Sequence, residues 1–143
     1  MSSMDAKPKY KTRLVAKGFK QQKGIDFDEI FFPVVKMTTL RTLLALVAIE
    51  DMELKQMDVK TTFLHGDLHE DLYMEQPIGF VVHASRKLVC RLCKTLYGLK
   101  QSPREWYQKI DAFMKSKGYV HSDEDPCLYT RKAMDGSLIV LVH

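Results

Sequence analysis

The chain has 143 residues, of which 45% are hydrophobic and 28% charged, so it has the composition of one modest globular domain rather than of a disordered chain. The longest apolar run, residues 43–49, is far shorter than the ~20 residues that a membrane-spanning helix needs, so we expect no membrane association. Residues 1–11 are polar and basic and lack the apolar core of a secretory signal, which predicts an intracellular location.

The net charge of +4 is unevenly distributed along the chain. Residues 1–24 hold seven basic side chains against one acidic, residues 50–75 eight acidic against two basic, and residues 86–117 nine basic against two acidic. Basic blocks are suited to phosphate backbones, and an acidic block is suited to divalent cations. Solvated charged faces give a similar distribution, so the charge pattern alone only modestly favours nucleic-acid binding over an ordinary charged surface.

The first elements that the sequence predicts are a short strand at residues 12–16, a polar loop at 18–29, and then a helix. Thr38 or Thr39 is expected to cap this helix. Its predicted apolar face recurs at helical spacing and consists of Leu40, Leu43, Leu44, Val47 and Ala48.

The middle of the chain predicts three strands. The first, residues 54–59, ends near Asp58, and Gly66 turns the chain after it. Residues 72–75 and 88–92 predict the other two. Taken alone, a carboxylate at a strand end is more often a turn or cap residue than a metal ligand.

Residues 102–117 predict the best-defined helix. Ser102 and Glu105 have the spacing of a capping box, and Pro103 is placed at the favoured first helical position. Its apolar stripe is Trp106, Ile110, Phe113 and Met114. Gly118 is expected to end the helix as a C-terminal cap.

Residues 127–130 and 137–142 predict a β-hairpin, with Asp135 and Gly136 as the turn. Helices mixed with a hairpin indicate an α+β fold, in which helices pack against an antiparallel sheet. Cys90 and Cys93 have C-x-x-C spacing, but a structural zinc site usually needs a second such pair. We therefore interpret these cysteines as small residues in a strand and its following turn.

Several longer segments then indicate a protein family. They are residues 11–19 (KTRLVAKGF), 32–35 (FPVV), 39–45 (TLRTLLA), 56–67 (QMDVKTTFLHGD), 73–77 (YMEQP), 96–104 (LYGLKQSPR) and 125–129 (DPCLY). In this order they resemble the motifs of reverse transcriptases from copia-type LTR retrotransposons, such as KARLVAKGF, QMDVKTAFLNGDL, YMEQP and LYGLKQAPR. The resemblance covers nearly the whole chain. Thr62 departs from it, because the family usually has alanine there.

The resemblance implies a magnesium site. Asp58 is placed as the first catalytic aspartate, and the backbone carbonyl of Val59 as a further ligand of Mg²⁺. Such enzymes use two ions to activate the attacking hydroxyl and to steady the leaving group. The family continues from a strand like residues 138–142 into a YVDD motif, whose aspartates complete the site. We therefore expect the 143 residues alone to lack polymerase activity.

The resemblance also implies a nucleotide site. Phe63 takes the position of the aromatic gate that excludes a ribose 2′ hydroxyl, and Thr61 and Thr62 line the sugar and phosphate pocket. Arg13 is placed on the triphosphate, a task suited to a planar guanidinium. The remaining implied contacts are Tyr97, Gly98 and Lys100. Without the resemblance, the favoured interpretation of Phe63 and Tyr97 is as core aromatics, and Arg13 and Lys100 are also interpretable as surface charges.

The implied architecture is an incomplete fingers and palm of a right-hand polymerase. Residues 1–36 and 67–97 are expected to be fingers-like, and residues 37–66 and 98–143 palm-like. The implied partners are an RNA or DNA template-primer and deoxynucleotides, in a cytoplasmic particle or the nucleus. Two alternatives are a non-catalytic nucleic-acid-binding remnant and a pseudogene product without function.

Overall fold

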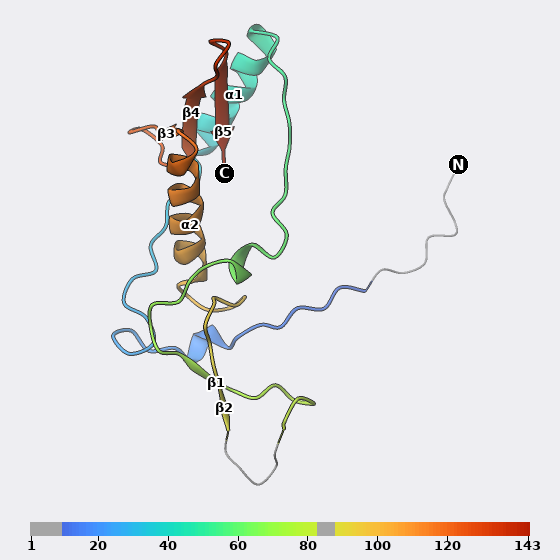
Figure 1. The fold of residues 1–143 in the computed structure, drawn as a ribbon, viewed down its shortest axis with the longest axis vertical. Helices are drawn as coiled ribbons and strands as arrows, with labels where there is room; N and C mark the ends of the chain where they lie inside the picture. Colours follow the sequence, from blue (N-terminus) through green and yellow to red (C-terminus); the bar gives the residue numbers. More distant parts are fainter. Residues whose placement is uncertain (1–9, 83–87) are drawn as a thin grey trace, which may run out of the picture.

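The computed structural model of the protein describes residues 10–82 and 88–143. Its elements in chain order are η1 (Gly18–Lys20), α1 (Met37–Ile49), η2 (Thr62–Leu64), β1 (Tyr73–Glu75), β2 (Val89–Arg91), α2 (Ser102–Ser116), β3 (Val120–His121), β4 (Leu128–Lys132) and β5 (Leu138–Val142). Figure 1 shows them in two groups, with α1, α2 and β3–β5 in the upper part and η1, β1 and β2 in the lower part. None of the described helices is long and apolar enough to cross a membrane.

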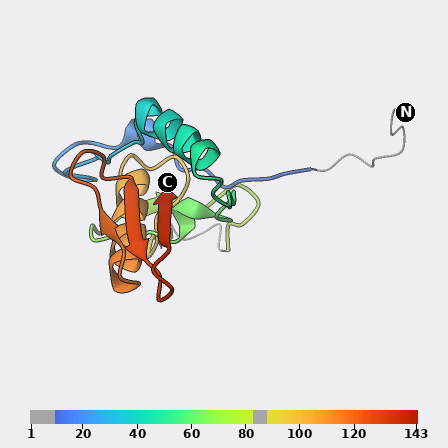
Figure 2. The ribbon, with the colours of Figure 1, turned by 90° about the horizontal axis from the view of Figure 1, so that it is seen from above.

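The upper group contains a three-stranded antiparallel sheet of order β3-β4-β5. Val120 pairs with Thr130, which in turn pairs with Val140. Gly136 turns the β4–β5 hairpin with a φ of +85°, as the sequence predicted. Figure 2, which looks down the long axis, shows α1 lying to one side of this hairpin.

The lower group contains the two-stranded antiparallel sheet of β1 and β2, in which Met74 pairs with Cys90. The strands predicted at 72–75 and 88–92 are thus confirmed. The predicted α+β class with antiparallel sheets and helices is confirmed as well. The finer division into fingers and palm stays a prediction.

A first buried cluster joins α2 to the sheet. Tyr129 is fully buried, and its hydroxyl donates to Oδ1 of Asp111 at 3.1 Å. Burial and this hydrogen bond raise the pKa of Tyr129 far above its ordinary value. The ring of His143 stacks on Tyr129 with 6.1 Å between centroids. This cluster fixes α2 against β4 and the end of β5.

A second buried cluster is polar and joins the lower group to the start of α2. Gln101 is fully buried, and its side-chain amide donates to the carbonyl of Asp26 at 3.0 Å. Its Oε1 accepts from Nε2 of Gln21 at 2.9 Å. The buried amide therefore has partners for both its donor and its acceptor, as a buried polar group requires.

Two predicted strands are wrong. Residues 12–16 form only an isolated parallel bridge between Val15 and Tyr97. Residues 54–59 belong to no sheet. A strand needs a neighbour to satisfy its N–H and C=O groups, and none of the described segments pairs with residues 54–59.

Both predicted N-terminal helix caps are wrong, although both helices are confirmed. α1 begins at Met37, and neither threonine is its N-cap, which is Lys36. α2 begins at Ser102, so Ser102 already lies inside the helix, and its hydroxyl donates to the carbonyl of Leu96 at 2.6 Å instead of capping. The turn through residues 96–101 brings that carbonyl within hydrogen-bond distance of the Ser102 hydroxyl.

The predicted apolar faces are only partly covered. In α2, Met114 is buried but Phe113 is 56% exposed. In α1 no residue is buried. Gly118, with a φ of +78°, follows the last turn of α2 as predicted, and its N–H donates to the carbonyl of Lys115.

Candidate functional site

Three of the predicted site residues, far apart in the sequence, form one cluster. The rings of Phe63 in η2 and Tyr97 meet edge to face, with centroids 5.2 Å apart and planes at 72°. The guanidinium carbon of Arg13 lies 5.8 Å from the centre of the Tyr97 ring, in cation–π geometry. The Tyr97 ring thus contacts both the Arg13 guanidinium and the Phe63 ring.

Gly98 holds the Arg13 segment against the Tyr97 segment. The N–H of Ala16 donates to the carbonyl of Tyr97 at 2.7 Å. A Cβ added at Gly98 would lie 2.2 Å from the Ala16 carbonyl oxygen, and one at Gly18 would lie 1.9 Å from the Gly98 carbonyl oxygen. Only glycine at both positions allows the two backbones to come this close. An approach of Gly98 to a nucleotide stays a prediction.

Lys100 makes its contacts on the other side of this turn. Its backbone N–H donates to Oε1 of Gln21 at 2.8 Å, and its ammonium to the carbonyl of Gln21 at 3.2 Å. The ammonium also lies 4.7 Å from the centre of the Phe27 ring. The contacts of Lys100 are therefore with the loop after η1, whereas those of Tyr97 are with Phe63 and Arg13.

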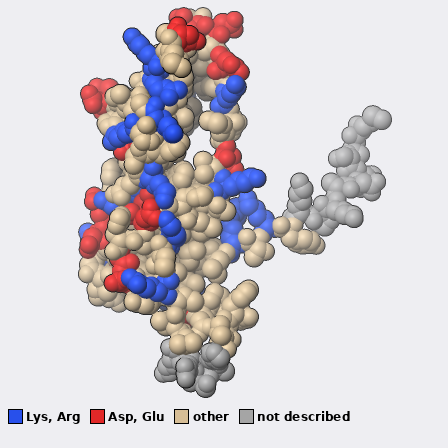
Figure 3. Space-filling model, in the orientation of Figure 1, with Lys and Arg blue, Asp and Glu red and all other residues tan. Residues whose placement is uncertain are grey.

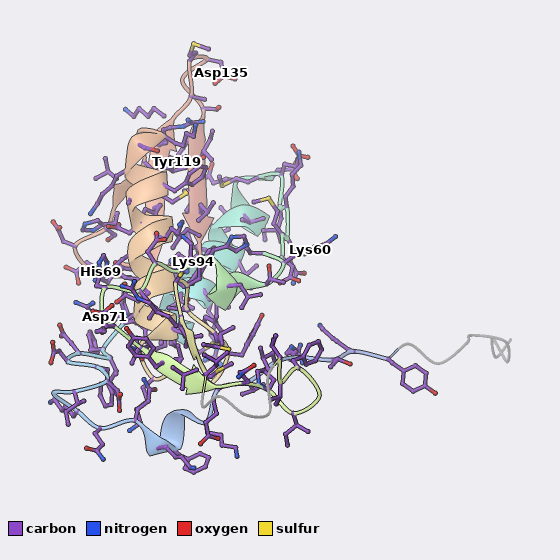
Figure 4. All side chains as sticks on the ribbon, turned by 60° about the horizontal axis from the view of Figure 1, so that its bottom comes forward. Lys60, His69, Asp71, Lys94, Tyr119 and Asp135 are labelled. Carbon is purple, nitrogen blue, oxygen red and sulfur yellow. The ribbon has the colours of Figure 1, made fainter. Side chains whose placement is uncertain are left out.

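The loop that leads to η2 is held in an unusual conformation. Thr61 has a φ of +54°, which is rare for a β-branched residue. Its hydroxyl donates to the Lys60 carbonyl at 2.7 Å, and Nε2 of His65 lies 3.2 Å from the same carbonyl. Figure 4 shows the Lys60 side chain pointing away from the protein. Backbone strain of this kind gathers at functional sites, and here it lies two residues before Phe63.

Asp58 and Val59 do not fit a complete two-ion magnesium site with the residues described. Both are exposed and lie in the unpaired segment before η2. The carbonyl of Val59 accepts a hydrogen bond from the Thr62 hydroxyl at 2.8 Å. No group of three or more histidine, cysteine or acidic side chains able to hold a metal occurs within residues 10–82 and 88–143. Asp58 is thus one candidate ligand rather than a metal centre.

The acidic and basic blocks of the sequence pair with each other. Asp67 binds Lys94 and also Lys109, the latter at 2.9 Å. These hydrogen bonds from Lys94 and Lys109 lower the pKa of Asp67 to about 2. Asp71 pairs with Arg91 at 2.6 Å, and Figure 4 shows Asp71, His69 and Lys94 on the same side of the protein. The sequence contains the signal for these pairs, because an acidic block lies between two basic blocks. From the sequence alone we instead expect the acidic block to bind cations and the basic blocks to bind phosphates.

The comparisons with known proteins show the family of the chain. A family model for reverse transcriptase (RNA-dependent DNA polymerase) matches residues 2–143. The chain belongs to this family. A retrovirus-related Pol polyprotein from the transposon TNT 1-94 of Nicotiana tabacum is 58% identical over 134 residues, which are 94% of this chain and 10% of that protein. The Pol polyprotein from transposon RE1 of Arabidopsis thaliana is 40% identical over 135 residues, 94% of this chain and 9% of that protein.

The chain therefore spans about a tenth of the length of these relatives. The resemblance to copia-type reverse transcriptases, which the sequence motifs carried, is confirmed by the family match and by these transposon relatives. No solved structure matches the chain.

Proposed function

We propose that the chain contributes the nucleotide-contacting part of an RNA-directed DNA polymerase encoded by a copia-type retrotransposon. The observation that carries the proposal is the cluster of Arg13, Phe63 and Tyr97, assembled from three separate segments. A guanidinium offers planar donors to a triphosphate, and an aromatic ring beside it sorts sugars by shape. Family membership supports nucleic acid and nucleotides as substrates.

In this proposal, Arg13 binds the triphosphate of an incoming deoxynucleotide and the Phe63 ring lies under its sugar. Thr61 and Thr62 lie beside the same pocket, because they immediately precede Phe63. Gly98 and Lys100 lie in the turn that follows Tyr97, and this turn supports the pocket. The template-primer runs past this site, inside the cell, in a cytoplasmic particle or the nucleus.

The two groups of elements in Figure 1 support a division into fingers and palm. Residues 1–36 and 67–97 are proposed as fingers-like, since η1, β1 and β2 lie together in the lower group. Residues 37–66 and 98–143 are proposed as palm-like, since α1, α2 and the three-stranded sheet form the upper group. The Phe63–Tyr97 contact then lies between the two.

Asp58 is proposed as one carboxylate ligand of Mg²⁺ in the intact polymerase, with the Val59 carbonyl as a second donor. Bound Mg²⁺ would supply charge neutralisation for the phosphates. Two ions need more carboxylates than Asp58 alone supplies, so we propose that the 143 residues by themselves do not polymerise. Primer extension with Mg²⁺ or Mn²⁺ checks this: no product is expected, and extension that is abolished by Asp58→Ala contradicts it.

Calorimetric titration of the 143-residue chain with dATP tests the nucleotide site. Arg13→Ala is expected to weaken binding by about tenfold or more, the cost of losing hydrogen bonds between a guanidinium and phosphate. Lys132→Ala, which removes a positive charge from the end of β4, is the matched control and is expected to bind as the unsubstituted chain does. Equal effects of the two substitutions would mean that Arg13 acts only through the net charge of the chain, which contradicts a specific contact with the triphosphate.

A second candidate function is sequence-independent binding of nucleic acid. Figure 3 shows Lys and Arg side chains in a line over α2 and the β4–β5 hairpin. Such a line is suited to a phosphate backbone. Filter binding across a salt series distinguishes this function: affinity that falls steeply with salt supports it, and no binding at low salt removes it.

A further inference from the structure

Thr95 is a fully buried polar residue that is not among the predicted site residues. Its hydroxyl donates to the backbone carbonyl of Phe63 and lies 3.5 Å from the carbonyl of Gly66. Its backbone N–H donates to the same Gly66 carbonyl at 3.1 Å. Thr95 therefore binds the η2 turn at two residues: Phe63, which lies within η2 and carries the proposed gate ring, and Gly66, where the chain leaves the turn.

The neighbourhood of Thr95 is built around this contact. A Cβ at Gly66 would lie 2.5 Å from the Thr95 hydroxyl oxygen and 3.0 Å from Cβ of Glu105. Glycine at position 66 thus leaves the space into which the threonine side chain fits. Asp67 then pairs with Lys94, the residue before Thr95, which joins the same two segments a second time on the surface.

Thr95 and Tyr97 act on two parts of one residue. Thr95 holds the backbone carbonyl of Phe63, while Tyr97 meets its ring edge to face at 5.2 Å between centroids. The segment that carries both is itself fastened to α2, because the Ser102 hydroxyl donates to the carbonyl of Leu96 at 2.6 Å. A continuous chain of contacts thus runs from α2 through residues 95–97 to the Phe63 ring.

We propose that Thr95 is a positioning residue for sugar selectivity: its buried hydroxyl fixes the Phe63 backbone and thereby the place of the ring that excludes a ribose. This inference rests on the proposed nucleotide site. A ring under a sugar discriminates a single hydroxyl only if its position is fixed, since a small displacement opens the space that it is meant to fill. Thr95 does not touch the nucleotide in this arrangement and acts only through Phe63.

Two substitutions separate the hydroxyl of Thr95 from its shape. Thr95→Val keeps the branched shape and removes the hydroxyl, which leaves the Phe63 carbonyl without its buried donor. Thr95→Ser keeps the hydroxyl and removes a methyl group. The ratio of the dissociation constants for ATP and dATP is measured by calorimetry for the unsubstituted chain and both variants, with Phe63→Ala as the reference for a lost gate.

We expect the unsubstituted chain to prefer dATP, Thr95→Ser to keep that preference, and Thr95→Val to reduce it by about three- to tenfold, the equivalent of one hydrogen bond. An unchanged ratio in Thr95→Val, with the preference lost in Phe63→Ala, overturns the role of Thr95 alone. No preference in the unsubstituted chain overturns the proposed gate together with the role of Thr95.

A measurement without nucleotide covers the case in which Thr95→Val is too unstable for titration. Nuclear Overhauser contacts between the Phe63 and Tyr97 rings report the ring position directly. They are expected to persist in Thr95→Ser and to weaken in Thr95→Val and in Thr95→Ala. Contacts of full strength in either variant that lacks the hydroxyl contradict the positioning role.

Discussion

The carboxylate of Asp125 accepts a hydrogen bond from the backbone N–H of Lys36 at 3.1 Å, across 89 residues of chain. Its Oδ1 accepts from the N–H of Cys127 at 3.0 Å, and the Lys36 ammonium donates to the carbonyl of Glu124 at 2.6 Å. Asp125 is only 2% exposed. The aspartate of the DPCLY segment thus fastens the start of α1 to the turn before β4, and it supplies the capping oxygen that neither threonine provides.

Replacement of Asp125 by alanine is expected to destabilise the fold by about 1–3 kcal/mol, because it leaves buried N–H groups without an acceptor. Urea denaturation provides the measurement. Asp123→Ala, at an exposed position of the same turn, is the control and is expected to change stability little. Equal losses in the two variants would show that the link to α1 contributes nothing.

Acid should weaken this same link. Burial acts to raise the pKa of Asp125, but its hydrogen bonds from Thr39 and from two backbone N–H groups outweigh burial, so the pKa is lowered. The stability that Asp125 contributes is therefore present above its unfolded pKa of about 3.9 and is lost as pH falls through the lower folded value. Asp125→Asn is expected to lose less stability than the unsubstituted chain as the pH falls below 4, as urea unfolding at several pH values would show. An equal loss in both proteins would show that Asp125 is not the group that titrates.

His143 should act in a different pH window. Burial lowers its pKa, although the nearby Asp111 acts to raise it. Its ring is packed against Tyr107 and Tyr129, at 5.8 and 6.1 Å between centroids. Because the unfolded chain binds the proton more readily, the contribution of neutral His143 is present above about pH 6.5 and falls as the pH drops below it.

His143→Gln is accordingly expected to reduce the loss of stability between pH 7 and pH 5. Urea unfolding at several pH values gives the slope for each protein. If the substituted and unsubstituted chains lose stability in parallel, His143 is not the group that titrates.

The close approach at Gly98 gives a prediction with a matched control. Gly98 and Gly136 have similar φ angles, +92° and +85°, but a Cβ would meet backbone only at Gly98. Gly136→Ala should cost about 1–2 kcal/mol for its positive φ alone. Gly98→Ala should cost about 1–3 kcal/mol more through overlap with the Ala16 carbonyl, as thermal melting would show. Equal melting temperatures for the two variants would mean that the segments need not lie this close.

The ion pairs of Asp67 make a prediction about nucleic acid. Asp67→Asn releases Lys94 and Lys109, so filter binding to single-stranded DNA should strengthen and its salt dependence should steepen by about two phosphate contacts. Asp135→Asn removes the same charge from the hairpin tip, where the carboxylate accepts from Ser137 rather than from lysine. Matching affinities for the two variants would exclude these lysines from the surface that binds DNA.

The sequence predicted elements whose signals are local, and it failed where a distant segment decides. The Asp135–Gly136 turn and the helix ending at Gly118 follow from neighbours in the chain. The Ser102 cap failed because α2 already begins at Ser102, with Gln101 as its N-cap. The strand at residues 54–59 failed because a strand forms only where another strand lies beside it, and none of the described segments pairs with these residues.

The site was predictable to the extent that family motifs carry it. Arg13, Phe63 and Tyr97 come together as their shared assignment to one pocket implies. Thr95 could not be predicted, because a single threonine forms no sequence pattern and its proposed role depends on how η2 folds around it. The hydrogen bond from the Thr62 hydroxyl to the Val59 carbonyl likewise depends on a local turn that the motif does not reveal.

A nuclear magnetic resonance titration of the isotope-labelled chain with dATP tests the nucleotide site most directly. We expect the largest shifts to occur together at Arg13, Phe63 and Tyr97, while β4 and β5 change little. Shifts spread over the basic line of α2, with none at Phe63, would contradict a nucleotide site and favour general binding of phosphates.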